Sequence, residues 1–87
     1  MSDRSLKVTV IGGGSSYTPE LIDGLIRYHK ELPVTDLYLV DIQEGWHKLE
    51  IVGGLAQRMI DHANLPIRVH LTLDRREAIR GASFVLT

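Results

Sequence analysis

The sequence contains no cysteine, and this absence excludes two classes of small domain. Neither a disulfide-stabilised scaffold nor a metal site built on thiolates can form within these 87 residues. No apolar run approaches the ~18–20 residues that a membrane-spanning helix needs. The first residues also lack the pattern of a signal peptide. We therefore expect a cytoplasmic protein with no membrane partner.

An excess of positive charge is missing as well. The 10 Lys and Arg residues are balanced by 11 Asp and Glu residues, which gives a formal net charge of −1 at pH 7. Nucleic acids and anionic membranes attract basic surfaces, so neither is expected as a partner. Hydrophobic residues make up 44% of the chain, a fraction typical of one small globular domain.

A glycine-rich stretch lies between a strand pattern and a helix start. Residues 6–11 are mostly apolar and β-branched, as in a strand that is covered on both faces. Three glycines follow at 12–14, and Thr-Pro-Glu at 18–20 is typical of a helix N-terminus, with Thr18 as the cap. Strand, glycine loop and helix in this order form the phosphate-binding corner of a dinucleotide-binding βαβ unit. For a bare glycine triplet, a structural turn without a ligand would be the alternative.

The rest of the chain alternates strands and helices. Beyond the first strand and helix, the patterns predict strands at 36–42, 67–73 and 84–86 and helices at 44–63 and 74–80. Right-handed crossovers make the four strands parallel, in the spatial order 3-2-1-4. The predicted fold is α/β, the first half of a Rossmann-like doubly wound sheet (β-α-β-α-β-α-β). We expect residues 1–87 to be the N-terminal part of an NAD-binding domain whose remainder lies outside this chain.

The second signal for a dinucleotide is the acid that ends the second predicted strand. A carboxylate at Asp41 can accept hydrogen bonds from the adenosine ribose, and its charge repels a 2′-phosphate, so NAD is the predicted cofactor. Capping of the next turn is the alternative role for Asp41. Ser15 and Ser16 can donate to phosphate oxygens or cap the helix. The candidate cofactor-binding residues are Gly12, Gly13, Gly14, Ser15, Ser16, Tyr17, Asp41 and Ile42.

Other site chemistry cannot be assembled from the sequence. The 4 histidines show no metal-ligand spacing and no nearby acid. No Ser/His/Asp arrangement or spaced pair of carboxylates is present. We therefore predict no catalytic residue and no metal ligand within the chain.

An extended motif carries a resemblance to one enzyme family. Residues 11–21, Ile-Gly-Gly-Gly-Ser-Ser-Tyr-Thr-Pro-Glu-Leu, resemble the N-terminal motif of the NAD-dependent family 4 glycoside hydrolases. Tyr17 departs from the general G-x-G-x-x-G fingerprint but fits the pattern of this family. Within the family, the likeness is to the bacterial 6-phospho-β-glucosidases. Further similar stretches are found at 31–34, 39–42, 48–53 and 72–78.

The resemblance implies a hydrolysis of phosphorylated β-glucosides that does not use the usual two carboxylates. In this family NAD transiently oxidises the sugar at C3, and a divalent metal, typically manganese, assists while a base removes the C2 proton. The family's catalytic and metal-binding residues would lie beyond residue 87, so this chain alone is expected to bind nucleotide and to be inactive. The full-length enzyme is expected to be a homo-oligomer. An NAD-dependent 2-hydroxy acid dehydrogenase of the lactate or malate type, which shares the fold and the acid at Asp41, is the alternative.

Overall fold

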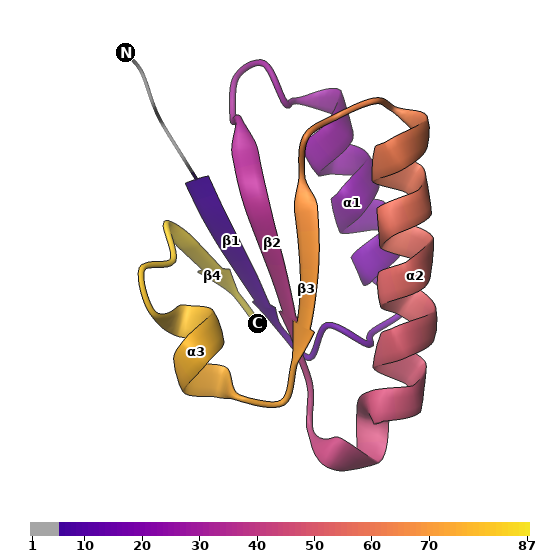
Figure 1. Cartoon of the computed structure of the whole chain (residues 1–87), viewed down its shortest axis with the longest axis vertical. Coiled ribbons are helices and arrows are strands. Elements are labelled where there is room, and N and C mark those ends of the chain that lie inside the picture. The colour runs from indigo at the N-terminus through magenta and orange to yellow at the C-terminus, as the bar shows by residue number, and fades with distance from the viewer. Residues whose placement is uncertain (1–5) are drawn as a thin grey trace.

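Four parallel strands form the centre of the structure, in the spatial order β3-β2-β1-β4 (Figure 1). The computed structural model describes residues 6–87. Helices α1 and α2 lie together on one side of the sheet, and α3 lies on the other side (Figure 1). In chain order the elements are β1 (Leu6–Ile11), α1 (Thr18–Arg27), β2 (Val34–Val40), the short 3₁₀ helix η1 (Gln43–Gly45), α2 (Trp46–His62), β3 (Arg68–Thr72), α3 (Arg75–Ile79) and β4 (Phe84–Leu86).

The predicted α/β fold and strand order are confirmed. Strand β1 pairs with β2 and β4, and β2 also pairs with β3, in each case in parallel. The second strand ends two residues earlier than predicted, at Val40. The physical reason is that the Ile42 N–H is bonded to the Asp41 carboxylate and not to a neighbouring strand. Asp41 therefore lies just after the strand, at the carboxyl edge of the sheet.

The main core lies between the sheet and helices α1 and α2. Alternation along each strand sends every second side chain to this face. The buried residues of this core are Val8, Val10, Val34, Leu37 and Leu39 from the sheet and Ile22, Leu25, Leu49, Ala56, Ile60 and Ile67 from the helices and loops. This packing fixes the ends of β1 and β2, which carry the glycine loop and Asp41.

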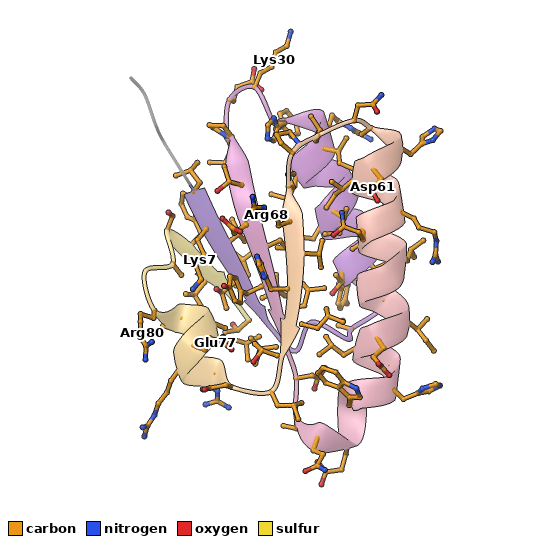
Figure 2. The ribbon with its side chains drawn as sticks, in the orientation of Figure 1. Lys7, Lys30, Asp61, Arg68, Glu77 and Arg80 are labelled. Carbon is orange, nitrogen blue, oxygen red and sulfur yellow. The ribbon has the colours of Figure 1, made fainter. Side chains whose placement is uncertain are left out.

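A row of polar and aromatic side chains covers the opposite face of the sheet. Lys7 Nζ donates to the carbonyls of Glu77 and Arg80, at 3.0 and 2.6 Å, and so attaches α3 to β1 (Figure 2). The same ammonium lies 4.1 Å from the ring centroid of Tyr38. Tyr38 stacks on His70 with 4.3 Å between the ring centroids. The bonds from Lys7 hold the short helix α3 against the sheet.

At the end of this row, Asp36 Oδ1 lies 2.9 Å from His70 Nε2. This hydrogen bond is the largest cause that holds the pKa of Asp36 below its ordinary value. Because the pKa is lowered on folding, the carboxylate stabilises the fold fully above about pH 4, and this contribution is lost as the pH falls through the lowered pKa.

We expect Asp36→Asn to lower the free energy of unfolding by about 0.2–1 kcal/mol at pH 7, because the pair is partly exposed. At a pH below the lowered pKa of Asp36, the variant and the parent protein should be equally stable, since the parent carboxyl is then protonated. Urea denaturation at both pH values measures this. Glu50→Gln, on the exposed side of α2, is the control and should show no difference at either pH. A loss of equal size at both pH values would contradict the assignment.

Candidate functional site

The loop after β1 turns back against β2, and its first two glycines are needed for different reasons. Gly12 has a φ of +79°, a conformation that favours glycine, and a Cβ there would meet no atom within 4 Å. A Cβ on Gly13 would lie 2.6 Å from the Cβ of Leu39. The amides of both glycines donate to the Val40 carbonyl at 2.8 Å. At Gly13 the loop is thus packed tightly against β2, whereas no protein atom fills the space where a side chain of residue 12 would lie.

Most amides of the loop are bonded within the protein. The Gly14 N–H donates to Asp41 Oδ2 at 3.0 Å, and the Tyr17 N–H donates to Ser15 Oγ at 3.1 Å. The Ser15 N–H donates to a carbonyl of the loop at 3.0 Å. Among residues 12–18, only the Ser16 N–H has no protein acceptor. A phosphate at this corner would therefore meet the Ser16 amide and the hydroxyls of Ser15 and Ser16.

The predicted helix cap at Thr18 is wrong. Thr18 is the buried first residue of α1, and its hydroxyl donates to the Gly13 carbonyl at 2.8 Å. Tyr17 occupies the N-cap position without a side-chain hydrogen bond. Ser15 Oγ accepts the N–H of Tyr17, which lies before the first residue of α1, so Ser15 does not cap the helix, which was its alternative role. Its hydroxyl hydrogen can still donate. Pro19 follows within the first turn, where no helical N–H is needed.

Asp41 lies between the glycine loop and α2. Its Oδ2 accepts the Gly14 N–H at 3.0 Å, and its Oδ1 accepts the Ile42 N–H at 2.8 Å. The second bond goes to the next residue, and the following turn η1 has Ile42 as its N-cap with no side-chain cap bond, so the alternative role of capping this turn is not seen. An ionised carboxylate has about four acceptor positions, so about two are left for the hydroxyls of a ribose. Asp41 can therefore order the loop and bind a ribose at the same time.

Two hollows meet at Gly12, at the carboxyl edge of the sheet. The first, which we call the Asp41 hollow, measures about 360 Å³ and is lined in part by Gly12, Asp41, Ile42, Leu73 and Arg75. The second, the β4 hollow, measures about 430 Å³ and is lined in part by Gly12, Ser15, Tyr17 and Leu86. Ligands of open parallel sheets bind at this edge, where neighbouring crossovers leave in opposite directions. A dinucleotide that crosses Gly12 would have one nucleoside in each hollow.

The structure brings five of the eight predicted cofactor residues to these hollows, namely Gly12, Ser15, Tyr17, Asp41 and Ile42. The other three residues of the loop line neither hollow: Gly13 and Gly14 are buried, and Ser16 is exposed. Leu73 and Arg75 were not predicted, because no local motif marks them. Their position after β3 was the available signal, since all parallel strands end at the same edge.

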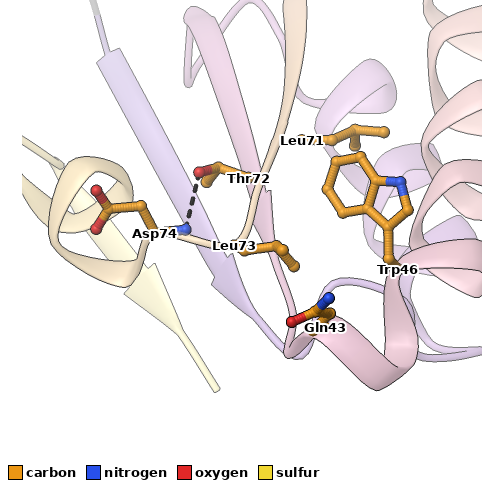
Figure 3. A pocket seen from close by; sticks show the side chains of 6 residues that line it. All are labelled: Gln43, Trp46, Leu71, Thr72, Leu73 and Asp74. Carbon is orange, nitrogen blue, oxygen red and sulfur yellow. Dashed lines mark hydrogen bonds between the residues drawn. The ribbon is translucent and has the colours of Figure 1, made fainter.

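A third and larger hollow, of about 620 Å³, shares Leu73 with the Asp41 hollow (Figure 3). Its lining consists of Gln43, Trp46, Leu71, Thr72, Leu73 and Asp74. Asp74 accepts the N–H groups of Arg76 and Glu77, so it caps α3 as predicted. Trp46 packs against the core. The lining contains one carboxylate and no basic side chain, and we assign no ligand to this hollow.

Metal binding requires a different set of side chains from those near the glycine loop. Within residues 6–87, no group of three or more His, Asp or Glu side chains could hold a metal ion. The same part of the chain contains no helix that is long and apolar enough to cross a membrane.

Comparison with known proteins places these features in a family. Residues 7–87 match the family described as family 4 glycosyl hydrolase. A probable 6-phospho-β-glucosidase of Bacillus subtilis is 60% identical over 84 residues, which cover 97% of this chain and 19% of the relative. The 6-phospho-β-glucosidase of Escherichia coli is 56% identical over 84 residues, with the same 97% and 19% coverage. The chain therefore spans 19% of the length of these relatives.

A solved structure supports the same relationship. It is the 6-phospho-β-glucosidase of Thermotoga maritima with manganese, NAD+ and glucose-6-phosphate, and it matches with a TM-score of 0.80 and 31% identity. The match covers 92% of this chain and 19% of that one. These relatives do not favour the alternative of a lactate- or malate-type dehydrogenase.

Proposed function

Because this chain belongs to family 4 of the glycosyl hydrolases, we propose that it is the nucleotide-binding N-terminal part of a 6-phospho-β-glucosidase. The observation that carries the proposal is the 60% identity to the B. subtilis relative across 97% of the chain. The relatives are much longer, since the chain covers 19% of their length, so the whole reaction is assigned to a longer protein. Residues 1–87 would form the first half of its Rossmann-like domain.

Exposed side chains on β4 support this division of the protein. Phe84, Val85 and Leu86 are 47%, 43% and 38% exposed, although all are large and apolar. An apolar edge strand is a template for pairing and is normally covered in a complete protein. The second half of the domain would cover this edge.

NAD is the cofactor that we propose for the two hollows. The geometry fits it in two respects. At Gly12 the space in front of the backbone is open, as a pyrophosphate requires, and Asp41 keeps acceptor positions for a ribose. When bound, NAD would supply a transient oxidation and re-reduction of the sugar, so that the net reaction is hydrolysis.

The residues of this chain would act by binding and positioning. Ser15 and Ser16 would hold the pyrophosphate at the start of α1, where the helix N-terminus favours negative charge. Asp41 would hold the ribose and, through the Gly14 amide, the shape of the loop. Residues 6–87 do not provide the donors that manganese needs, so we propose that its ligands lie elsewhere in the enzyme. We also propose a cytoplasmic homo-oligomer that acts on a small phosphorylated sugar.

The activity can be tested with a chromogenic substrate. The full-length enzyme should release p-nitrophenol from p-nitrophenyl 6-phospho-β-glucoside in the presence of NAD, manganese and a reductant. The 6-phospho-α-glucoside is the matched control and should be cleaved much more slowly. Lack of release from the β-substrate would refute the proposed reaction.

We assign nucleotide binding to this chain and catalysis to the rest of the enzyme, and this assignment is tested with the 87-residue segment alone. It should show no turnover, because we place the metal ligands and the substrate pocket outside it. Isothermal titration calorimetry should still detect binding of NAD. Turnover by the segment would contradict the proposed division.

A further inference from the structure

The Asp41 hollow is lined by a second charged residue that the proposed NAD site does not use. Arg75, the first residue of α3, lines this hollow together with Asp41 and Ile42. Within residues 6–87 the structure shows neither an ion pair nor a hydrogen bond for its guanidinium. Arg75 and Asp41 thus line the same hollow, and no ion pair joins their side chains.

These two groups have opposite preferences for the 2′ position of an adenosine ribose. A carboxylate accepts hydrogen bonds from a free 2′-hydroxyl and repels a 2′-phosphate, whereas a nearby arginine accommodates the phosphate. Guanidinium binds phosphate with two parallel, charge-assisted hydrogen bonds. Both kinds of residue line this hollow.

We propose that Arg75 attracts a 2′-phosphate and that the charge of Asp41 outweighs this attraction, so that this pair sets the choice between NAD and NADP. The inference rests on the proposed nucleotide site and adds a residue that determines its specificity. Removal of the Asp41 charge should therefore be enough to admit NADP, provided that Arg75 is present.

The backbone of Arg75 is held in place from two directions. On one side, Asp74 caps α3 by accepting the amides of the two residues that follow Arg75. On the other side, the Thr9 hydroxyl donates to the Ala78 carbonyl, and Lys7 holds the C-terminal end of α3. Both Thr9 and Lys7 belong to β1, which leads directly to Gly12. The start of α3 is therefore fixed relative to the glycine loop.

The choice of variant at Asp41 matters because its carboxylate also orders the loop through the Gly14 and Ile42 amides. Asp41→Asn removes the charge and keeps an acceptor oxygen for one of these two amides, while the other amide loses its acceptor. Arg75→Ala removes the proposed phosphate ligand. Arg76→Ala removes the same charge from the next residue, which does not line the hollow, and is the matched control.

The experiment measures the dissociation constants of NAD and NADP by calorimetry on the full-length enzyme. In Asp41→Asn, the affinity for NADP relative to NAD should rise by about tenfold or more, as expected for one charge-assisted hydrogen bond. Addition of Arg75→Ala should abolish this gain, whereas addition of Arg76→Ala should preserve it. No gain in Asp41→Asn, or a gain that survives the loss of Arg75, would overturn the inference.

Thermal unfolding of each variant shows whether the loop change has affected folding. If Asp41→Asn does not fold, Arg75→Ala and Arg76→Ala are compared in the otherwise unchanged enzyme. The weak affinity for NADP should then fall in Arg75→Ala alone, and an equal fall in both variants would overturn the inference. If the unchanged enzyme binds no NAD, the proposed function itself is refuted. Binding of NAD without the Arg75-dependent shift refutes only the role of Arg75.

Discussion

Gly13→Ala is expected to lower the free energy of unfolding by about 1–3 kcal/mol, the usual cost of overpacking. The new Cβ would lie 2.6 Å from the Cβ of Leu39 and 2.9 Å from its Cα, and the second contact is with backbone that cannot rotate away. The loop would have to move from β2, which would break the bond from the Gly13 amide to the Val40 carbonyl. Urea or thermal unfolding measures the loss.

The matched control is Gly24→Ala, in the middle of α1. A Cβ at Gly24 would meet no atom within 4 Å, so nothing in the structure opposes it. Because alanine is the better helix former, this variant should be more stable than the parent by up to about 1 kcal/mol. Equal losses in the two variants would show that the packing of Gly13 on Leu39 is not the cause.

Gly12→Ala is expected to act mainly on the nucleotide. Its methyl group would meet no protein atom within 4 Å, but it would occupy the space in which the two hollows meet. We expect the dissociation constant for NAD to rise by about tenfold or more, equivalent to at least about 1.4 kcal/mol. The positive φ of +79° adds a strain of about 1–2 kcal/mol to the fold. Calorimetry well below the melting temperature measures the affinity.

Gly81→Ala separates the two effects of the Gly12 variant. Gly81 has a similar φ of +71° and equally open space, but it follows α3 and lines neither hollow. This control should carry the same strain and leave NAD affinity unchanged. If both variants weaken NAD binding equally, strain in the fold is the cause, and Gly12 does not face the cofactor.

The double use of Asp41 changes how variants of this residue should be interpreted. Asp41→Ala would remove a proposed ribose ligand and, at the same time, the acceptor of the Gly14 amide. A loss of NAD affinity in that variant therefore does not show direct contact with the ribose. The dependence of NADP binding on Arg75 is more informative, because Arg75 makes no hydrogen bond that holds the loop.

Local patterns in the sequence were sufficient for the element types, the strand order and one helix cap. The period-two and helical spacing of apolar residues reflects the burial of each element on one or both faces. The cap at Asp74 was predictable because it uses amides only two and three residues away. The glycine stretch and Asp41 were recognisable for the same reason, because each follows a strand directly. The family was recognisable from residues 11–21, and the match to residues 7–87 confirms it.

Tertiary structure decided what these residues touch. The cap role expected of Thr18 failed because its hydroxyl reaches the Gly13 carbonyl, a partner set by the fold of the loop. Arg75 joins Asp41 in one hollow only because β2 and β3 end at the same edge of the sheet. A linear sequence determines which elements form, since that depends on neighbours a few positions apart. Which side chains share a hollow depends on how the strands pair, and only the assembled sheet sets that.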